Sequence, residues 1–307
     1  MARLLAADAL DLADLIPEWR TSLQATRKSP RTVRAYTDGA LRFRAFLAEA
    51  GMPTAPASLH REHIEAYMVS LEGLADSTAA THYRNLQQLF NWLLSEGEVP
   101  SHPMARMSPP KIGEKAIPVV PRHHIDALLK TCSPGSFEDR RDEALIRLYL
   151  ATGLRLEEGV SLTGDALDRE TRQLVVHGKG NRTRIVVIPS VALKALDRYL
   201  RLRRRHPHAA LPWLWLGPRG QFTKSGVTQL LRRRSRRAGI DPPIHPHQLR
   251  HTWAHGLKAK GMAADEQMYL GGWKTMQMLN RYAASAVGER ARASLERLAE
   301  GDDYAGM

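Results

Sequence analysis

The chain has 307 residues, of which 43% are hydrophobic, and a net charge of +13, which predicts two domains and an anionic partner rather than one small neutral module. No apolar run reaches the roughly 18 residues of a membrane span, and Asp8, Asp11 and Asp14 interrupt the N-terminal stretch; both features argue against a membrane anchor or signal peptide and favour the cytoplasm. The single cysteine, Cys132, excludes an internal disulfide, and we expect its thiol to be buried.

Helical patterns fill residues 12–99. Ser29 followed by Pro30 predicts a helix start, and that helix should end at Gly51. A second helix should open at residues 76–77 and end at Gly97, with one apolar face made of Leu86, Leu89, Phe90, Leu93 and Leu94. The faces left to solvent should carry a basic edge that contacts DNA, made of Arg27, Lys28, Arg31, Arg34, His82 and Arg84.

Six prolines between residues 100 and 121 rule out a helix or a central strand and predict a linker. We therefore expect a helical domain over 1–108, a linker over 109–121 and a second domain over 122–307. In the second domain, residues 173–177 and 182–188 are rich in β-formers and should pair as a hairpin around 178–181. The fold class is accordingly mainly α with a small β-hairpin, in the α+β class.

Positive charge is concentrated late in the chain. Residues 198–237 hold twelve Lys and Arg and no acid, and this density favours phosphate contacts with nucleic acid over a merely solvated face. The candidate DNA-binding residues there are Arg232, Arg233, Arg234, Arg236 and Arg237.

Residues 245–255 hold four histidines and one arginine, a cluster that could bind a metal, move a proton or grip an anion. A helix beginning at Pro246 would place His247, Arg250 and His251 on one face. Thr252 stands where an HExxH zinc site has its glutamate, and a fixed positive charge lies among the supposed ligands, so a phosphate suits this cluster better than a metal.

Other single residues are weak signals by themselves. Arg155 follows a helix that ends at Gly153, which is more often a helix cap with a solvated arginine, although Glu158 lies three residues on to orient it. Lys179 is at the predicted hairpin tip, where most lysines are simply exposed. Trp273 and Tyr282 could both be ordinary core or half-buried aromatics.

Taken together and in order, the segments ATGLRLEE, HGKGNRTRIVVIP, HPHQLRHTWA and LGGWKTMQMLNRYA resemble the motifs of the tyrosine recombinase (phage integrase) family. The resemblance covers roughly residues 12–290 and includes the N-terminal helical bundle, which resembles the SAM-like core-binding domain of that family. It is closest in type to Xer-like and simple integrases that lack an arm-binding domain. The second domain would then be the catalytic domain.

The resemblance implies a role for each motif residue. Arg155 and Arg250 would hold the non-bridging oxygens of a scissile DNA phosphate, with His247 assisting proton transfer at the attacking group. Lys179 would protonate the departing 5′ oxygen, and Tyr282 would be the nucleophile, while Glu158 and His251 would support the arginines. Trp273 replaces a histidine that most members carry, and its N–H can donate to a phosphate but cannot shuttle a proton. This chain also reads LGGW where LGH is usual.

The residue types fit this chemistry. Two arginines and a helix N-terminus supply fixed charge for a phosphodiester transition state, and a phosphotyrosine keeps the bond energy for rejoining, so we expect no cofactor, metal or ATP. The expected function is site-specific recombination of duplex DNA, as integration, excision or transposition of a mobile element. The alternatives are a type IB topoisomerase-like strand relaxation and a non-catalytic DNA-binding regulator of the same fold.

The implied partner is duplex DNA with paired half-sites, bound by a homotetramer that is a monomer in free solution. Residues 288–300 predict a short C-terminal tail helix with an apolar stripe of Ala291, Leu295 and Leu298. Such a stripe generally folds back on its own domain, but the family resemblance implies docking on the neighbouring protomer.

Overall fold

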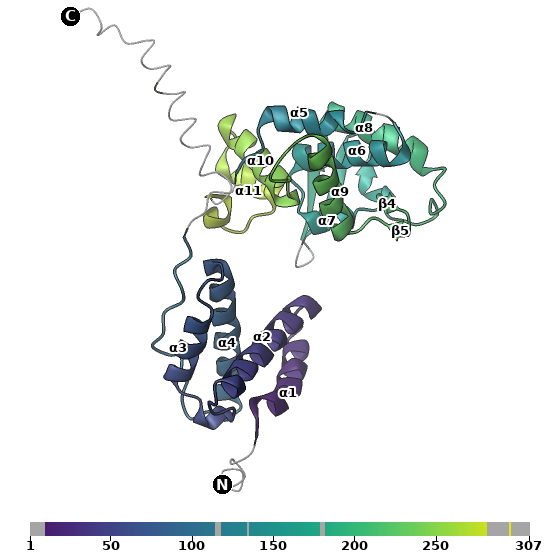
Figure 1. The fold of residues 1–307 in the computed structure, drawn as a ribbon. Helices are drawn as coiled ribbons and strands as arrows, with labels where there is room; N and C mark the ends of the chain where they lie inside the picture. Colours follow the sequence, from purple (N-terminus) through teal and green to yellow (C-terminus); the bar gives the residue numbers. More distant parts are fainter. Residues whose placement is uncertain (1–9, 114–117, 134, 179–181, 281–294, 296–307) are drawn as a thin grey trace, which may run out of the picture. The chain divides into compact units, whose positions relative to one another are not determined.

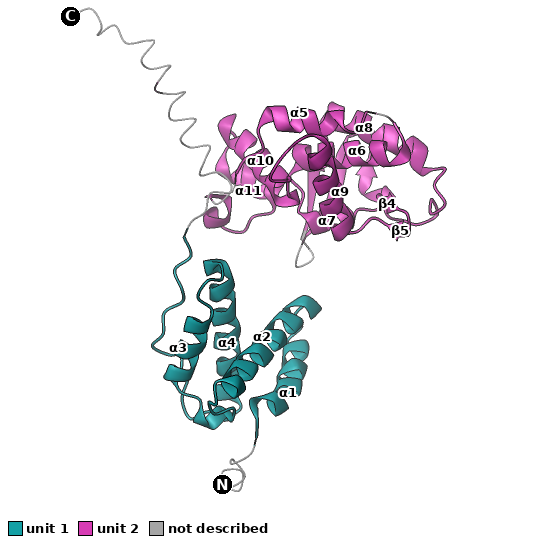
Figure 2. Ribbon diagram, viewed as in Figure 1, with its two compact units in different colours: residues 1–114 teal, residues 115–307 magenta. Residues whose placement is uncertain are grey.

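The computed structural model describes residues 10–113, 118–133, 135–178, 182–280 and 295. It divides the chain into two compact units, residues 1–114 and 115–307 (Figure 2). Each unit buries its own set of apolar side chains. Every helix within the described ranges is too short or too polar to cross a membrane.

The first unit is helical in its described part. Its elements are α1 (Leu12–Ala25), α2 (Pro30–Glu49), the 3-10 turn η1 (Pro56–Ser58), α3 (Arg61–Ser70) and α4 (Asp76–Ser95) (Figure 1). The predicted start of α2 is confirmed: Pro30 is its first residue, and the Ser29 hydroxyl accepts a hydrogen bond from the Thr32 N–H at 3.2 Å. This cap satisfies one of the free N–H groups of the first helical turn.

The core of the first unit forms where α2 and α4 face each other and α1. Phe43 from α2 meets Phe90 from α4 edge to face, with ring centroids 6.2 Å apart, and Trp19 from α1 stacks on Tyr36. The predicted apolar face of α4 is correct for Leu86, Leu89, Phe90 and Leu93, which are at most 1% exposed. It is wrong for Leu94, which is 41% exposed because it lies off the stripe that meets α2.

The second unit is mainly helical where the structure describes it, and two small antiparallel sheets form in that part. Its helices are α5 (Arg122–Lys130), α6 (Phe137–Thr152), α7 (Leu156–Val160), η2 (Gly164–Ala166), α8 (Ser190–Arg203), α9 (Lys224–Arg237), α10 (Pro246–Ala259) and α11 (Ala264–Gly271). Helix α6 packs against α8 and α10 and is the central helix of this core. Cys132 is buried here, as expected, at 1% exposure.

The predicted hairpin is confirmed as β2 (Gln173–Gly178) paired with β3 (Arg182–Val187). The sequence did not predict β1 (Leu167–Asp168), which extends this sheet in the order β1-β2-β3, nor the pair β4 (Leu216–Gly217) and β5 (Gly220–Gln221). These two-residue strands are too short for an alternating pattern to appear. The predicted class, mainly α with a small β component, is confirmed.

Candidate active site

The predicted arginines meet at the end of α11. Arg155 precedes α7, and its Nη2 donates to the Gly272 carbonyl at 2.7 Å. Arg250 comes from α10, and its two terminal nitrogens donate to the carbonyls of Gly153 and Gly271. Two guanidinium groups that are distant in the sequence are therefore held by adjacent residues of one turn.

Gly153 does end helix α6, with a φ of 59° in the left-handed region. A side chain there would also collide with the ring of Trp253, since a Cβ would lie 2.0 Å from it. The arginine that follows is not simply solvated, because Arg155 Nη1 donates to Glu158 Oε1 at 2.8 Å. The expected contact between Arg155 and Glu158 is present, and it leaves the Arg155 side chain 33% exposed.

Glu158 is buried and ionised. Burial alone would raise its pKa, but hydrogen bonds from Arg184 and Arg155 outweigh burial and hold the pKa of Glu158 at about 2. Arg184 was not predicted as a site residue. The available signal was the alternation of β3, in which Arg184 shares the inward side of the strand with Val186 and Ile188.

Helix α10 begins at Pro246, as predicted, and its first two turns carry the histidines of this site. His247 is exposed, while His251 is 2% exposed. Burial, together with electrostatic repulsion from the neighbouring His247 and Arg250, lowers the pKa of His251 to about 4. His251 is therefore neutral at neutral pH, and only His247 of this pair presents its ring to solvent.

The Trp273 ring lies against Arg250 and Trp253. It lies 4.6 Å from the Arg250 guanidinium carbon and 5.9 Å from the ring of Trp253, measured between centroids. Stacking of this kind fixes the plane of an arginine without neutralising it. The double glycine before Trp273 has a spatial reason: a Cβ on Gly271 would lie 2.4 Å from the Trp273 ring, and one on Gly272 would crowd Arg155 and Arg184.

The structure thus brings together Arg155, Glu158, His247, Arg250, His251 and Trp273. Lys179 and Tyr282 lie outside the described residues. Counting Arg184, this group holds three arginines and one carboxylate, that of Glu158, which contacts Arg155 and Arg184. These residues together therefore carry more positive than negative charge. A surplus of fixed positive charge next to an exposed imidazole is suited to binding a phosphodiester and stabilising the charge that develops when it reacts. In the described part of the chain no three His, Cys, Asp or Glu side chains converge as a metal site would need.

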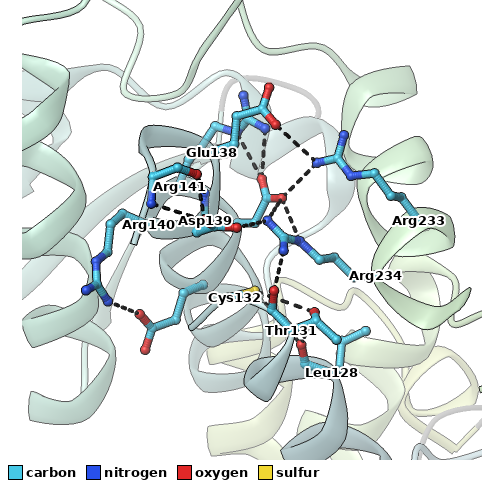
Figure 3. A network of polar contacts seen from close by, with 12 residues as sticks. Leu128, Thr131, Cys132, Glu138, Asp139, Arg140, Arg141, Arg233 and Arg234 are labelled. Carbon is cyan, nitrogen blue, oxygen red and sulfur yellow. Dashed lines mark hydrogen bonds and ion pairs between the residues drawn. The ribbon is translucent and has the colours of Figure 1, made fainter. Parts of the chain in front are cut away.

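Two of the predicted DNA-binding residues, His82 and Arg234, are buried rather than exposed to solvent. His82 is buried at 8% exposure; its Nδ1 lies 2.8 Å from the Tyr67 hydroxyl, and burial lowers its pKa. Arg234 is 1% exposed and donates to Asp142 and Asp139 at 2.7 and 2.8 Å (Figure 3). The basic run of α9 contains no acid in sequence, but helix α6 supplies the acids in space.

The other predicted basic residues are exposed. In the first unit these are Arg27, Lys28, Arg31, Arg34 and Arg84, and on α9 they are Arg232, Arg236 and Arg237. Arg233 is also exposed, at 43% of its side chain, but it contacts Asp142 at 3.0 Å. Helix α9 therefore has one row of arginines exposed to solvent and a second row that pairs with the acids of α6.

Comparison with known proteins identifies the family of the chain. The profile of the phage integrase family matches residues 118–289, and that of the phage integrase N-terminal SAM-like domain matches residues 15–97. The tyrosine recombinase XerC of Alcanivorax borkumensis is 30% identical over 273 residues, 86% of this chain and 87% of that protein. XerD of Listeria monocytogenes is 29% identical over 255 residues, 81% of this chain and 86% of that protein.

Solved structures show the same fold. A post-cleavage complex of the XerH site-specific recombinase with palindromic difH substrate has a TM-score of 0.75 at 17% identity, covering 92% of this chain and 84% of that one. The Tn1549 transposon integrase in complex with a circular intermediate DNA has a TM-score of 0.70 at 17% identity, covering 94% of this chain and 100% of that one.

Proposed function

The chain belongs to the phage integrase family and is a tyrosine recombinase, and we propose that it cleaves and rejoins duplex DNA through a covalent 3′-phosphotyrosine at Tyr282. The observation that carries this proposal is the convergence of Arg155 and Arg250 on the Gly271–Gly272 turn, with one carboxylate among three arginines. The substrate is a DNA site with paired half-sites, on a mobile element that is integrated, excised or transposed in the cytoplasm.

In the proposed reaction the Tyr282 oxygen attacks the scissile phosphorus and the bond from phosphorus to the 5′ oxygen breaks. His247 accepts the tyrosine proton, and Lys179 gives a proton to the departing 5′ oxygen. Arg155 and Arg250 stabilise the charge on the non-bridging oxygens, and Trp273 keeps the Arg250 guanidinium in plane. A 5′ hydroxyl from the partner strand then attacks the phosphotyrosine, which restores the phosphodiester without ATP.

The test is a nicked suicide substrate that traps the covalent intermediate. Tyr282→Phe should bind the half-site with unchanged affinity and form no adduct, because it lacks the nucleophilic oxygen. The matched control is Tyr269→Phe, since Tyr269 lies on α11 and is 61% exposed. An adduct that persists in Tyr282→Phe, or that is lost in Tyr269→Phe, contradicts the assignment.

For DNA contacts we propose the exposed basic residues alone. These are Arg27, Lys28, Arg31, Arg34, Arg84, Arg232, Arg236 and Arg237, with Arg233 partly engaged by Asp142. Their side chains are exposed and can reach phosphates, whereas a buried arginine paired with carboxylates cannot.

For assembly we propose a monomer in free solution and a tetramer on paired half-sites. The second unit has an open pocket of about 1350 Å³, lined by apolar residues from α5, α6 and α10 and by charged residues. More of these charged residues are cations than acids: Arg122, Lys130, Arg140, Arg147 and Lys260 against Asp126 and Glu143. We assign this pocket to the C-terminal tail of a second copy, whose residues 289–303 carry five acids and three arginines around the apolar stripe.

The tail stripe itself is outside the described residues except for Leu295, whose side chain is 67% exposed. Burying two leucines would contribute about 3–6 kcal/mol before ordering costs, so docking should be weak until DNA gathers the protomers. A chain truncated after Val287 should bind one half-site normally and fail to form the four-protomer synaptic complex. Normal synapsis by the truncated chain would contradict docking in trans.

A further inference from the structure

Three successive carbonyls at the end of α11 accept hydrogen bonds from three arginines that are far apart in the sequence. Leu270 O accepts from Arg184 Nε of β3 at 2.9 Å, Gly271 O from Arg250 of α10, and Gly272 O from Arg155 Nη2 at 2.7 Å. The last carbonyls of a helix lack partners within the helix and carry its partial negative charge. They therefore hold the arginines without cancelling a whole positive charge.

Arg184 also contacts Glu158, which in turn binds Arg155. Its Nη1 and Nη2 donate to Glu158 Oε1 and Oε2 at 2.9 and 2.8 Å, in a two-pronged ion pair whose side chains are 7% and 4% exposed. Arg155 uses the remaining acceptor sites, with Nη1 on Oε1 and its backbone N–H on Oε2, both at 2.8 Å. Each carboxylate oxygen thus accepts one bond from each arginine.

This arrangement gives the two arginines different tasks. Arg184 is buried, and the three nitrogens of its guanidinium donate to Glu158 and Leu270. Arg155 is the more exposed of the pair, at 33% of its side chain, and is oriented by Glu158 and Gly272. A bidentate fork of this kind requires the planar guanidinium, and a lysine ammonium cannot reproduce it.

We propose that Arg184 is a positioning residue of the recombinase reaction: the Leu270 carbonyl and Glu158 hold Arg184 in place, and through Glu158 it orients the Arg155 guanidinium. The inference rests on the proposed function, in which Arg155 binds the scissile phosphate. Arg184 itself does not touch the DNA. Removing Arg184 should leave the Arg155 side chain less well oriented. It should also raise the pKa of Glu158, since Arg184 makes the largest hydrogen-bond contribution to the low pKa of that carboxyl.

The test compares Arg184→Met with Arg184→Lys in single-turnover cleavage of the suicide half-site. Arg184→Met should lower the cleavage rate about 10- to 100-fold, a size typical of residues that orient a catalytic group, with half-site affinity unchanged. Arg184→Lys retains one charged contact and should recover part of the rate. The matched control is Arg169→Met, which removes an arginine from an ion pair with Asp197 in which both side chains are partly exposed, and should cleave at the wild-type rate.

Coupling to Arg155 separates positioning from a general loss of structure. If Arg184 acts through Arg155, the double variant Arg184→Met with Arg155→Lys should cleave within about 2-fold of Arg155→Lys alone. The cleavage rate of Arg184→Met relative to wild type should also fall further as the pH is lowered from 7 to about 5. In the variant Glu158 has lost its bonds from Arg184 and begins to protonate in this range, whereas in the wild type it stays ionised. Multiplying effects in the double variant, or a ratio independent of pH, would overturn the proposal.

Failure of the proposed function gives a different result. If the wild-type chain forms no adduct, the recombinase mechanism at Tyr282 fails. The coupling between the arginines is then measured by urea unfolding of the wild type, the two single variants Arg184→Met and Arg155→Lys, and the double variant. The unfolding effects of Arg184→Met and Arg155→Lys should then still be non-additive, because both arginines bind Glu158. Additive unfolding effects would show that the two arginines do not act as one unit and would overturn the inference.

Discussion

Two arginine clusters of the second unit use the same residue types for opposite purposes. Around α6 and α9, Arg141, Arg233 and Arg234 meet Glu138, Asp139 and Asp142, three charges of each sign (Figure 3). Around the end of α11, Arg155 and Arg184 meet Glu158, and these two arginines and Arg250 also donate to backbone carbonyls. The first cluster is neutral overall, and the second keeps a net positive charge.

The two clusters differ in whether carboxylates neutralise the charge of their arginines. Arg234 and Asp142 are 1% and 0% exposed, and breaking such a pair leaves an uncompensated charge in a medium of low polarity. Carbonyl oxygens orient an arginine equally well but do not neutralise it, so the positive field remains available to an incoming phosphate. We therefore expect the net charge of a cluster, rather than the burial of any one arginine, to separate a cluster that stabilises the fold from one that can bind a phosphate.

The largest effect should come from the cluster at α11. Arg155→Ala should slow adduct formation on the suicide substrate by about 10³-fold, equivalent to roughly 4 kcal/mol of transition-state stabilisation. Its free energy of unfolding should change by less than about 1 kcal/mol, because Glu158 keeps Arg184 as a partner. Urea unfolding measures the free energy of unfolding. A large loss of stability in Arg155→Ala would mean that the α11 cluster, like the cluster of α6 and α9, mainly stabilises the fold.

The reverse result is expected at the neutral cluster. Arg234→Met should lower the free energy of unfolding by about 3 to 4 kcal/mol, since it leaves Asp139 and Asp142 buried with fewer partners. Cleavage per folded molecule should stay at the wild-type rate, as normalised by half-site binding. The exposed control Arg232→Met should leave stability unchanged. A cleavage defect in folded Arg234→Met would contradict the division.

Acid should act on the α11 cluster through Glu158. Its folded pKa of about 2 lies below the ordinary value near 4.5, so its contribution to stability is complete above pH 4.5 and is lost as the pH falls toward 2. Glu158→Gln should therefore cost about 2 to 3 kcal/mol at neutral pH and much less near pH 2. Urea unfolding across this range measures the difference. A difference that does not vary with pH would mean that Glu158 is not held ionised by its arginines.

The smallest effect concerns DNA affinity. Neutralising Arg232, Arg236 and Arg237 should make the log–log dependence of half-site affinity on salt shallower by about 0.9 for each DNA phosphate that these arginines would otherwise neutralise. The slope should not depend on Arg234, which is buried and paired with carboxylates. Fluorescence anisotropy over a salt series measures the slope. An unchanged slope in the triple variant would place this row of arginines away from the DNA.

Much of the fold followed from local rules. The cap at Ser29, the proline at the start of α10 and the alternation of β2 and β3 predicted their elements because each depends on neighbouring residues only. The motif order likewise led to Arg155, Glu158 and Arg250. The short strands β1, β4 and β5 were missed because their pairing partners, not their own residues, define them.

By itself, the sequence determined the family, the mainly helical class and the candidate residues, since motif spacing and local capping are written along the chain. Only the tertiary structure decided which arginines are available. Arg234 and Arg232 stand two positions apart in one basic run, yet α6 brings carboxylates to the first and leaves the second exposed. Electrostatic free energy depends on distances in space and on burial, and neither can be read from the order of residues.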